Sequence, residues 1–215
     1  MRAESREPRA ESGAGTAASR EPRAARVGTA RDRNGLAAGA VLVFLSLVLS
    51  CLPAAAAKAG SDPLQALGLQ APKEAVDAPD FSLPDLSGKQ IPLKQLRGKL
   101  VFLNFFATWC GPCREEMPGM ERLHRAHQGN GLVVLSVNVQ ESAKTIRPFL
   151  QALKLSFPTV MDAEGAVSRE YGVRALPVSF LIGRDGKIVW RAIGGRDWES
   201  PQARQYFTQL VAEKR

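Results

Sequence analysis

Two cysteines separated by two residues are the feature of this sequence that most directly suggests chemistry. Cys110 and Cys113 enclose Gly111 and Pro112, and Trp109 precedes them. An apolar run ends just before this segment and a helical pattern begins within it, so Cys110 is expected at a helix start. Free N–H groups and the helix dipole there favour a thiolate. The second cysteine, one turn into the helix, can reach the first and close a disulfide, so the pair predicts redox chemistry.

Zinc binding and a purely structural disulfide are the two non-catalytic alternatives for this pair. A zinc site needs a second pair of ligands. The third cysteine, Cys51, lies in an apolar N-terminal segment, and His124 and His127 lie farther along the same predicted helix. A structural disulfide that closes so short a loop would stabilise the fold little. We therefore expect thiol–disulfide exchange with no metal and, since no glycine-rich dinucleotide loop occurs, no cofactor.

Length and charge exclude several other classes of protein. The chain has 215 residues, a mass of 23.2 kDa and a formal net charge of +8, which suits one ordinary domain with appendages. Its basic residues form no run that would follow a phosphate backbone, so we expect a mildly basic surface and no nucleic-acid partner.

The N-terminal third is expected to lie outside the folded domain. Residues 1–35 are rich in Arg, Ala, Glu and Ser and have few large apolar side chains, which predicts a disordered basic extension. Residues 36–57 are uncharged and apolar, which predicts a cleaved signal peptide, a retained membrane anchor or, through Cys51, a lipid anchor. We expect a linker at 58–72 and the folded domain at 73–215.

The position of two arginines predicts where that domain resides. Arg31 and Arg33 precede the apolar segment, and basic residues beside such a segment tend to stay inside the cell. The domain is therefore expected to be extracytoplasmic, in the periplasm or at the outer face of the inner membrane. If residues 36–57 are retained, they would attach it to the membrane.

The domain itself shows alternating strand and helix patterns. Nearly continuous apolar runs predict buried strands, amphipathic stretches predict helices, and Asp185-Gly186 predicts a hairpin. This order favours an α/β fold with a central mixed sheet flanked by helices on both faces. The expected strands are 100–106, 132–139, 178–182 and 187–192, and the expected helices are 112–127, 142–153 and 201–212.

The motif WCGPC at a strand-to-helix junction resembles the thioredoxin family, and its surroundings resemble the exported bacterial TlpA/ResA-like thiol–disulfide oxidoreductases. The similar segments are 78–89, 102–118 and 172–188. The resemblance implies a thioredoxin-like fold. It also implies that Pro177 is a cis-proline that faces the cysteine pair and presents neighbouring backbone to an extended substrate. Substrate contacts are then expected at Trp109, Gly111, Pro112, Leu176 and Pro177.

Two positions at which related proteins have an acidic residue bear on proton transfer. Asn104 stands where cytoplasmic thioredoxins have a buried aspartate, and Glu116 matches an active-site glutamate of the ResA-like proteins. Glu116 follows Cys113 by three residues, so it could exchange the proton of that thiol. Alternatively, Glu115 and Glu116 are first-turn acids that stabilise a helix start. Either way we expect Glu116 near an exposed helix start, where its substitution changes stability little.

The mechanism that the pair predicts is attack by the Cys110 thiolate on a substrate disulfide, followed by resolution of the mixed disulfide by Cys113. The electrons must come from outside the chain, and the resemblance implies a membrane thiol reductant as donor. The expected partners are extracytoplasmic proteins that contain disulfides. Haem-site cysteines of cytochrome c, copper-centre cysteines and general periplasmic disulfides all suit this chemistry.

Two other functions fit the same residues less well. A copper-binding or metallochaperone protein could use both thiolates, but the sequence offers no evident third ligand. A peroxiredoxin-like antioxidant would need a proline and a hydroxyl residue upstream of the reactive cysteine, where this chain has Leu103 and Ala107.

Overall fold

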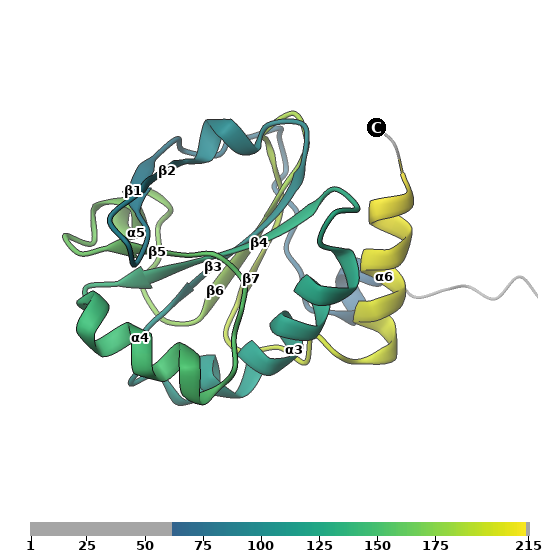
Figure 1. Ribbon diagram of the computed structural model, residues 1–215. Coiled ribbons are helices and arrows are strands. Elements are labelled where there is room, and N and C mark those ends of the chain that lie inside the picture. The colour runs from purple at the N-terminus through teal and green to yellow at the C-terminus, as the bar shows by residue number, and fades with distance from the viewer. Residues whose placement is uncertain (1–61, 214–215) are drawn as a thin grey trace, which may run out of the picture. The chain divides into compact units, whose positions relative to one another are not determined.

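The computed structural model describes residues 62–213 (Figure 1). The predicted extension at 1–35 and the predicted export or anchor segment at 36–57 lie outside these residues. Across 62–213, no helix has both the length and the apolar character needed to cross a membrane.

A five-stranded mixed sheet forms the centre of the domain, in the order β5-β4-β3-β6-β7. The central strand β3 pairs in parallel with β4 and antiparallel with β6, and all seven of its residues are buried. This burial explains its continuous apolar sequence, because both of its faces are covered. The strands are β3 (Leu100–Phe106), β4 (Leu132–Val139), β5 (Thr159–Asp162), β6 (Val178–Ile182) and β7 (Ile188–Ile193).

The sequence patterns predicted four of these strands and missed β5. Its four residues pair in parallel with the end of β4, and they are too few to show a periodicity. The antiparallel pair of β1 (Ser82–Pro84) and β2 (Gln90–Pro92) forms a separate small sheet. The sequence of residues 81–86, which ends at Ser87-Gly88, is typical of a short extended piece and contains β1, whereas β2 has no such signal.

The helices cover the two faces of the sheet unequally. The long helices α3 (Gly111–His127), α4 (Ala143–Ala152) and α6 (Pro201–Ala212) pack against one face. The opposite face is covered by the short elements α5 (Ala166–Glu170) and η1 (Leu93–Leu96) and by the β1–β2 pair. In Figure 1, α3 and α4 lie on the opposite side of the sheet from β1, β2 and α5. Both parallel crossovers step in the same direction along the sheet, so their right-handedness places α3 and α4 on the same face.

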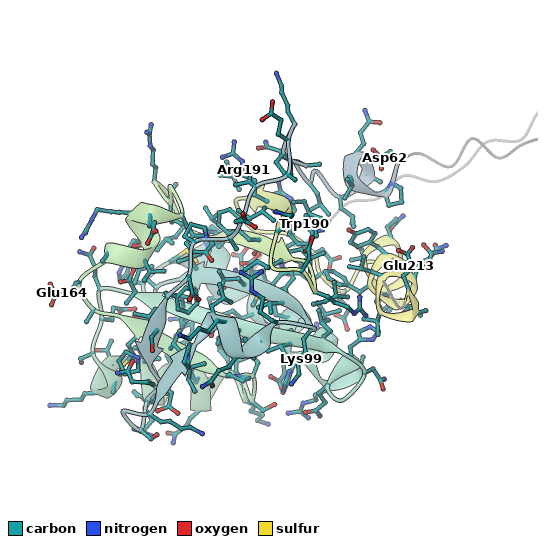
Figure 2. All side chains as sticks on the ribbon, turned by 90° about the horizontal axis from the view of Figure 1, so that it is seen from above. Asp62, Lys99, Glu164, Trp190, Arg191 and Glu213 are labelled. Carbon is teal, nitrogen blue, oxygen red and sulfur yellow. A yellow bond between two sulfur atoms is a disulfide. The ribbon has the colours of Figure 1, made fainter. Side chains whose placement is uncertain are left out.

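The prediction of a linker at 58–72 is wrong for the part that the structure describes. Residues Pro63–Ala66 form the short helix α2, capped by Asp62. Leu69 is buried in the main core, and Gln70 pairs with Arg191 of β7. The domain therefore includes residues before 73. Asp62 and Glu213, which bound the described residues, lie on the same side of the domain (Figure 2). A four-residue helix among prolines and small residues gives no sequence signal that separates it from a linker.

An aromatic cluster fixes the segment that follows β7. The ring of Phe102 on β3 packs edge-on against Trp190, Trp198 and Phe207, at centroid distances of 4.9–5.9 Å. Trp190 lies on β7 and Phe207 on α6, whereas Trp198 lies in the loop that joins them. The cluster thereby holds this loop beside α3, where the cysteine pair lies.

Candidate functional site

The cysteine pair lies where β3 passes into α3. Cys110 is the N-cap of α3, and the backbone N–H of Cys113 donates a hydrogen bond to its Sγ atom at 3.3 Å. The two cysteines form a disulfide with a Cα–Cα distance of 5.3 Å. Cys110 is 5% exposed, whereas Cys113 is fully buried. The outer sulfur is therefore the one that an external disulfide can approach, and it lies at the positive end of the helix dipole.

Pro177 lies at the same end of the sheet as the pair. The peptide bond between Leu176 and Pro177 is cis, as the resemblance implied. β6 runs antiparallel to β3 with Val178 opposite Phe105, so the residues before β6 meet the carboxyl end of β3. The carbonyl of Pro177 accepts a hydrogen bond from the N–H of Gly194 at 2.8 Å, which ties this segment to the end of β7.

The remaining residues predicted to contact substrate surround the pair. Trp109 is 75% exposed, Gly111 and Pro112 are exposed, and Leu176 is half-buried. The loop after β7 approaches closely, because a Cβ atom at Gly195 would lie 3.3 Å from the carbonyl oxygen of Pro112. Trp109, Gly111 and Pro112 thus flank the disulfide along the chain, and Leu176 precedes Pro177 at the same end of the sheet.

Glu116 is buried, in contrast to the expectation of a position near an exposed helix start. Its side chain lies in the second turn of α3 and the residue is only 4% exposed. Its Oε1 accepts a hydrogen bond from Asn104 Nδ2 at 2.9 Å. Its Oε2 accepts bonds from the backbone N–H of Arg196 at 3.1 Å and from Trp198 Nε1 at 3.0 Å. The exposed position on which the expected small effect on stability rested is therefore wrong, because the carboxyl group is buried and joins three segments of the fold.

Burial and hydrogen bonding act in opposite directions on this acid. Burial disfavours the charged carboxylate and is the larger effect, whereas the bonds from Arg196, Trp198 and Asn104 favour it. The pKa of Glu116 is raised from 4.5 to about 7. Glu116 also lines a cavity of about 390 Å³ between α3 and the loop after β7. The carboxyl group can therefore change its protonation state near neutral pH, beside a space large enough for water.

Asn104 takes part in the site through Glu116. Its Nδ2 also donates a hydrogen bond to Ser179 Oγ at 3.0 Å, and its side chain is fully buried. A neutral amide on β3 thus supports an acid on α3. Trp198 packs in the core and also donates a hydrogen bond to this carboxyl group. Its long sequence separation from Glu116 left no local pattern that would have revealed the bond.

Glu141 is a residue of the site that the sequence patterns did not single out. One of its oxygens accepts a hydrogen bond from Thr108 Oγ1 at 2.6 Å, and the other accepts bonds from the N–H of Thr108 and from Asn138 Nδ2, both at 2.7 Å. Thr108 immediately precedes Trp109, so Glu141 fixes the loop that leads into the pair. Its position just after a parallel strand is a signal that could have found it, because polar residues at such strand ends often form sites.

Comparisons with known proteins agree with this geometry. A model of the AhpC/TSA family matches residues 75–191. The thiol-disulfide oxidoreductase ResA of Bacillus thuringiensis subsp. konkukian is 38% identical over 135 residues, which are 63% of this chain and 77% of that protein. ResA of Bacillus subtilis is 41% identical over 122 residues, or 57% and 68% of the two chains.

Solved structures give the same result. The thiol:disulfide interchange protein DsbE from Chlorobium tepidum superposes with a TM-score of 0.60 at 32% identity, over 65% of this chain and 99% of that one. StoA from Bacillus subtilis superposes with a TM-score of 0.52 at 27% identity, over 62% and 97%. The thioredoxin-like fold predicted for the domain is confirmed.

The raised pKa of Glu116 predicts how stability depends on pH. In the unfolded chain this group ionises near pH 4.5, and in the folded protein near pH 7. Between these values ionisation stabilises only the unfolded state, so stability falls as pH rises. In the oxidised protein, the free energy of unfolding of wild type should fall by about 3 kcal/mol relative to Glu116→Gln between pH 4.5 and pH 7. Denaturant titrations of both proteins measure this, and a pH-independent difference would contradict it.

Proposed function

The chain belongs to the AhpC/TSA family and is a thiol–disulfide oxidoreductase with a thioredoxin-like fold, and from this premise we propose that it reduces disulfides of extracytoplasmic proteins. The observation that carries this proposal is the succession of three reactive groups along one face of α3, beginning at its N-cap. Cys110 is the outer sulfur at the helix N-cap, Cys113 is buried beneath it, and Glu116 lies one turn farther on the same face of the helix.

Reduction of a client disulfide requires two exchange steps. The Cys110 thiolate attacks one client sulfur and forms a mixed disulfide, and the other client sulfur leaves as a thiolate. The Cys113 thiolate then attacks the Cys110 sulfur, which releases the second client thiolate and forms the Cys110–Cys113 disulfide. Two electrons pass to the client. A membrane thiol reductant, by the reverse exchange, would return two electrons to the pair.

The second step needs Cys113 to lose its proton, and we propose that the carboxylate of Glu116 accepts it. A buried thiol ionises reluctantly in apolar surroundings, so a neighbouring base accelerates its attack. A carboxyl group with a pKa of about 7 is matched to this task near neutral pH. The cavity beside Glu116 lets the acid exchange the proton with water afterwards. Asn104, Trp198 and the Arg196 backbone act as positioning groups for this acid.

The location outside the cytoplasm is part of the same proposal. It is supported by the order of Arg31, Arg33 and the apolar segment 36–57 in the sequence, because flanking arginines tend to stay inside. Membrane attachment through that segment belongs to the same proposal. The clients that this chemistry fits are proteins whose cysteines must be reduced outside the cytoplasm, including haem-site cysteines of cytochrome c and cysteines of copper centres. Substrate contacts are assigned to Trp109, Gly111, Pro112, Leu176 and Pro177.

Neither alternative function gains a supporting observation. Within residues 62–213, no group of three or more His, Cys, Asp or Glu side chains lies together in a metal-binding arrangement. A peroxidase loop would need a proline at position 103 and a hydroxyl residue at position 107. Leu103 and Ala107 are instead fully buried apolar residues.

The reduction potential tests whether the protein works as a reductase. Gly111 and Pro112 between the cysteines are the dipeptide of thioredoxin, whose potential is about −270 mV. We expect the potential of the Cys110–Cys113 couple to lie close to this value at pH 7, measured by equilibration with thiol–disulfide buffers. A value near the strongly oxidising end, about −120 mV, would instead make the protein a donor of disulfides.

The order of the two exchange steps predicts different behaviour for the two cysteine variants. Reduced Cys113→Ser should form a covalent mixed disulfide with a protein disulfide and then stall, because it lacks the resolving thiol. Cys110→Ser should form little adduct, because Cys113 is buried. Non-reducing gel electrophoresis and peptide mass mapping show which cysteine carries the client. Adduct formation through Cys113 in the Cys110→Ser variant would reverse the assignment.

A further inference from the structure

One face of the sheet carries an open groove over strands β6 and β7. The three long helices all lie on the other face, and on this face Tyr171, the C-cap of the short helix α5, packs against Phe180 of β6. Two adjoining cavities of about 380 and 360 Å³ lie here, and both are lined by Tyr171, Phe180 and Arg191. Figure 2 labels Arg191 beside its neighbour Trp190; Trp190 is buried in the main core, whereas Arg191 is exposed on the groove side.

Exposed apolar side chains mark both ends of this groove. Val76 is 45% exposed and lines the first cavity, and Ile193 is 47% exposed and lines the second. Among residues 62–213, the only other large apolar side chain with such exposure is Trp109 beside the cysteine pair. Ile193 pairs with Val178, the residue after Pro177, so the groove ends where the substrate-contacting segment begins. Exposed apolar side chains that continue from an active site indicate a binding surface.

The edge of the sheet is open at the same place. Gln70 and Arg191 exchange two backbone hydrogen bonds, at 2.8 and 2.9 Å. Ile193 is two residues farther along β7, so its N–H and C=O also point away from β6. Within the described chain, no backbone group pairs with them across this edge. In the same antiparallel register Gly68 would stand opposite Ile193, but the carbonyl of Gly68 accepts a hydrogen bond from the Arg196 side chain instead. The backbone groups of Ile193 are therefore left for an extended peptide to pair with.

The charged side chains that line the groove are all basic, whereas the carboxylates of Glu170 and Asp80 act on Tyr171 from outside this lining. Lys73, Arg174 and Arg191 line it, and no acidic residue does. Over residues 62–213, neither Lys73 nor Arg174 takes part in an ion pair. This charge disfavours a second copy of the chain, whose identical groove would be equally basic. It also disfavours this chain's own residues 1–61, which carry nine basic and five acidic side chains.

We propose that this groove binds an extended, acidic segment of the client protein. The segment pairs with the Ile193 edge of β7, places an apolar side chain over Phe180, and directs carboxylates to Lys73 and Arg174. Its course leads to Pro177 and so delivers the client disulfide to Cys110. This inference rests on the proposed function and adds the class of client that the site selects.

A pair of synthetic peptides tests the groove. Both contain a two-cysteine disulfide followed by an extended apolar segment, with three aspartates in one peptide and three lysines in the other; a small aromatic disulfide reports on the cysteine pair alone. The variants are Arg174→Glu and, as the matched control, Lys144→Glu, an exposed position on α4. Arg174→Glu should raise KM for the acidic peptide by about tenfold, because it places like charges together. Its KM for the lysine peptide should fall, and its rate with the small disulfide should not change.

Other outcomes of this experiment have different meanings. Equal KM values for both peptides with wild type, or equal effects of Arg174→Glu and Lys144→Glu, would overturn the groove and leave the reductase intact. A wild-type dimer in sedimentation that becomes monomeric in Ile193→Ala would assign the face to a second copy and also overturn it. If wild type reduced neither the peptides nor the small disulfide, the proposed function itself would fail.

Discussion

The burial of one carboxyl group is the constraint on which the geometry around the cysteine pair depends. Glu116 on α3 accepts hydrogen bonds from Asn104 on β3 and from the backbone of Arg196 and the indole of Trp198 after β7. The bonds join three segments around Glu116, which lies one helical turn from Cys113. The aromatic cluster around Phe102 then holds Trp198 in place. Movement of any one of these segments would leave a buried polar group without its partner, which is costly.

The same burial makes the acid chemically useful. In water-like surroundings, three hydrogen bonds to the charged carboxylate would lower its pKa. Such a carboxylate would be too weak a base to take a proton from a thiol. Desolvation outweighs the three donors here, so the pKa of Glu116 rises to about 7. The fold thus gives up part of its stability at neutral pH to hold an acid that is ready to exchange a proton. An amide at position 104, where an acid would compete for that proton, is consistent with this division of roles.

The features of the fold and the site that the sequence could predict are those set by local patterns. β3, β4, β6 and α6 have the predicted bounds, because buried apolar runs and an amphipathic helix are encoded by neighbouring residues. The redox pair was visible for the same reason, as a short motif at a strand-to-helix junction. Pro177 could be placed near the pair only through the resemblance, since its position follows from the register of β6 against β3.

The features that the sequence could not predict depend on residues far apart in the chain. Glu116 is buried because Trp198, 82 residues later, covers it, and no helical periodicity contains that contact. Glu141 binds Thr108 across 33 residues. Leu69 and Gln70 join the domain through β7, although their surroundings have the composition of a linker. The basic groove likewise exists only because all three long helices lie on the other face.

The rate at which the mixed disulfide is resolved tests the role of Glu116 most directly. Single-turnover reduction of a model disulfide should be followed from pH 5 to pH 9 for wild type, Glu116→Gln and, as the control, the exposed neighbour Glu115→Gln. If Glu116 accepts the proton of Cys113, the wild-type rate rises as Glu116 ionises near pH 7, Glu115→Gln behaves in the same way, and Glu116→Gln is slower and lacks this rise. Identical pH profiles for all three proteins would contradict it and would leave Glu116 with a structural role alone.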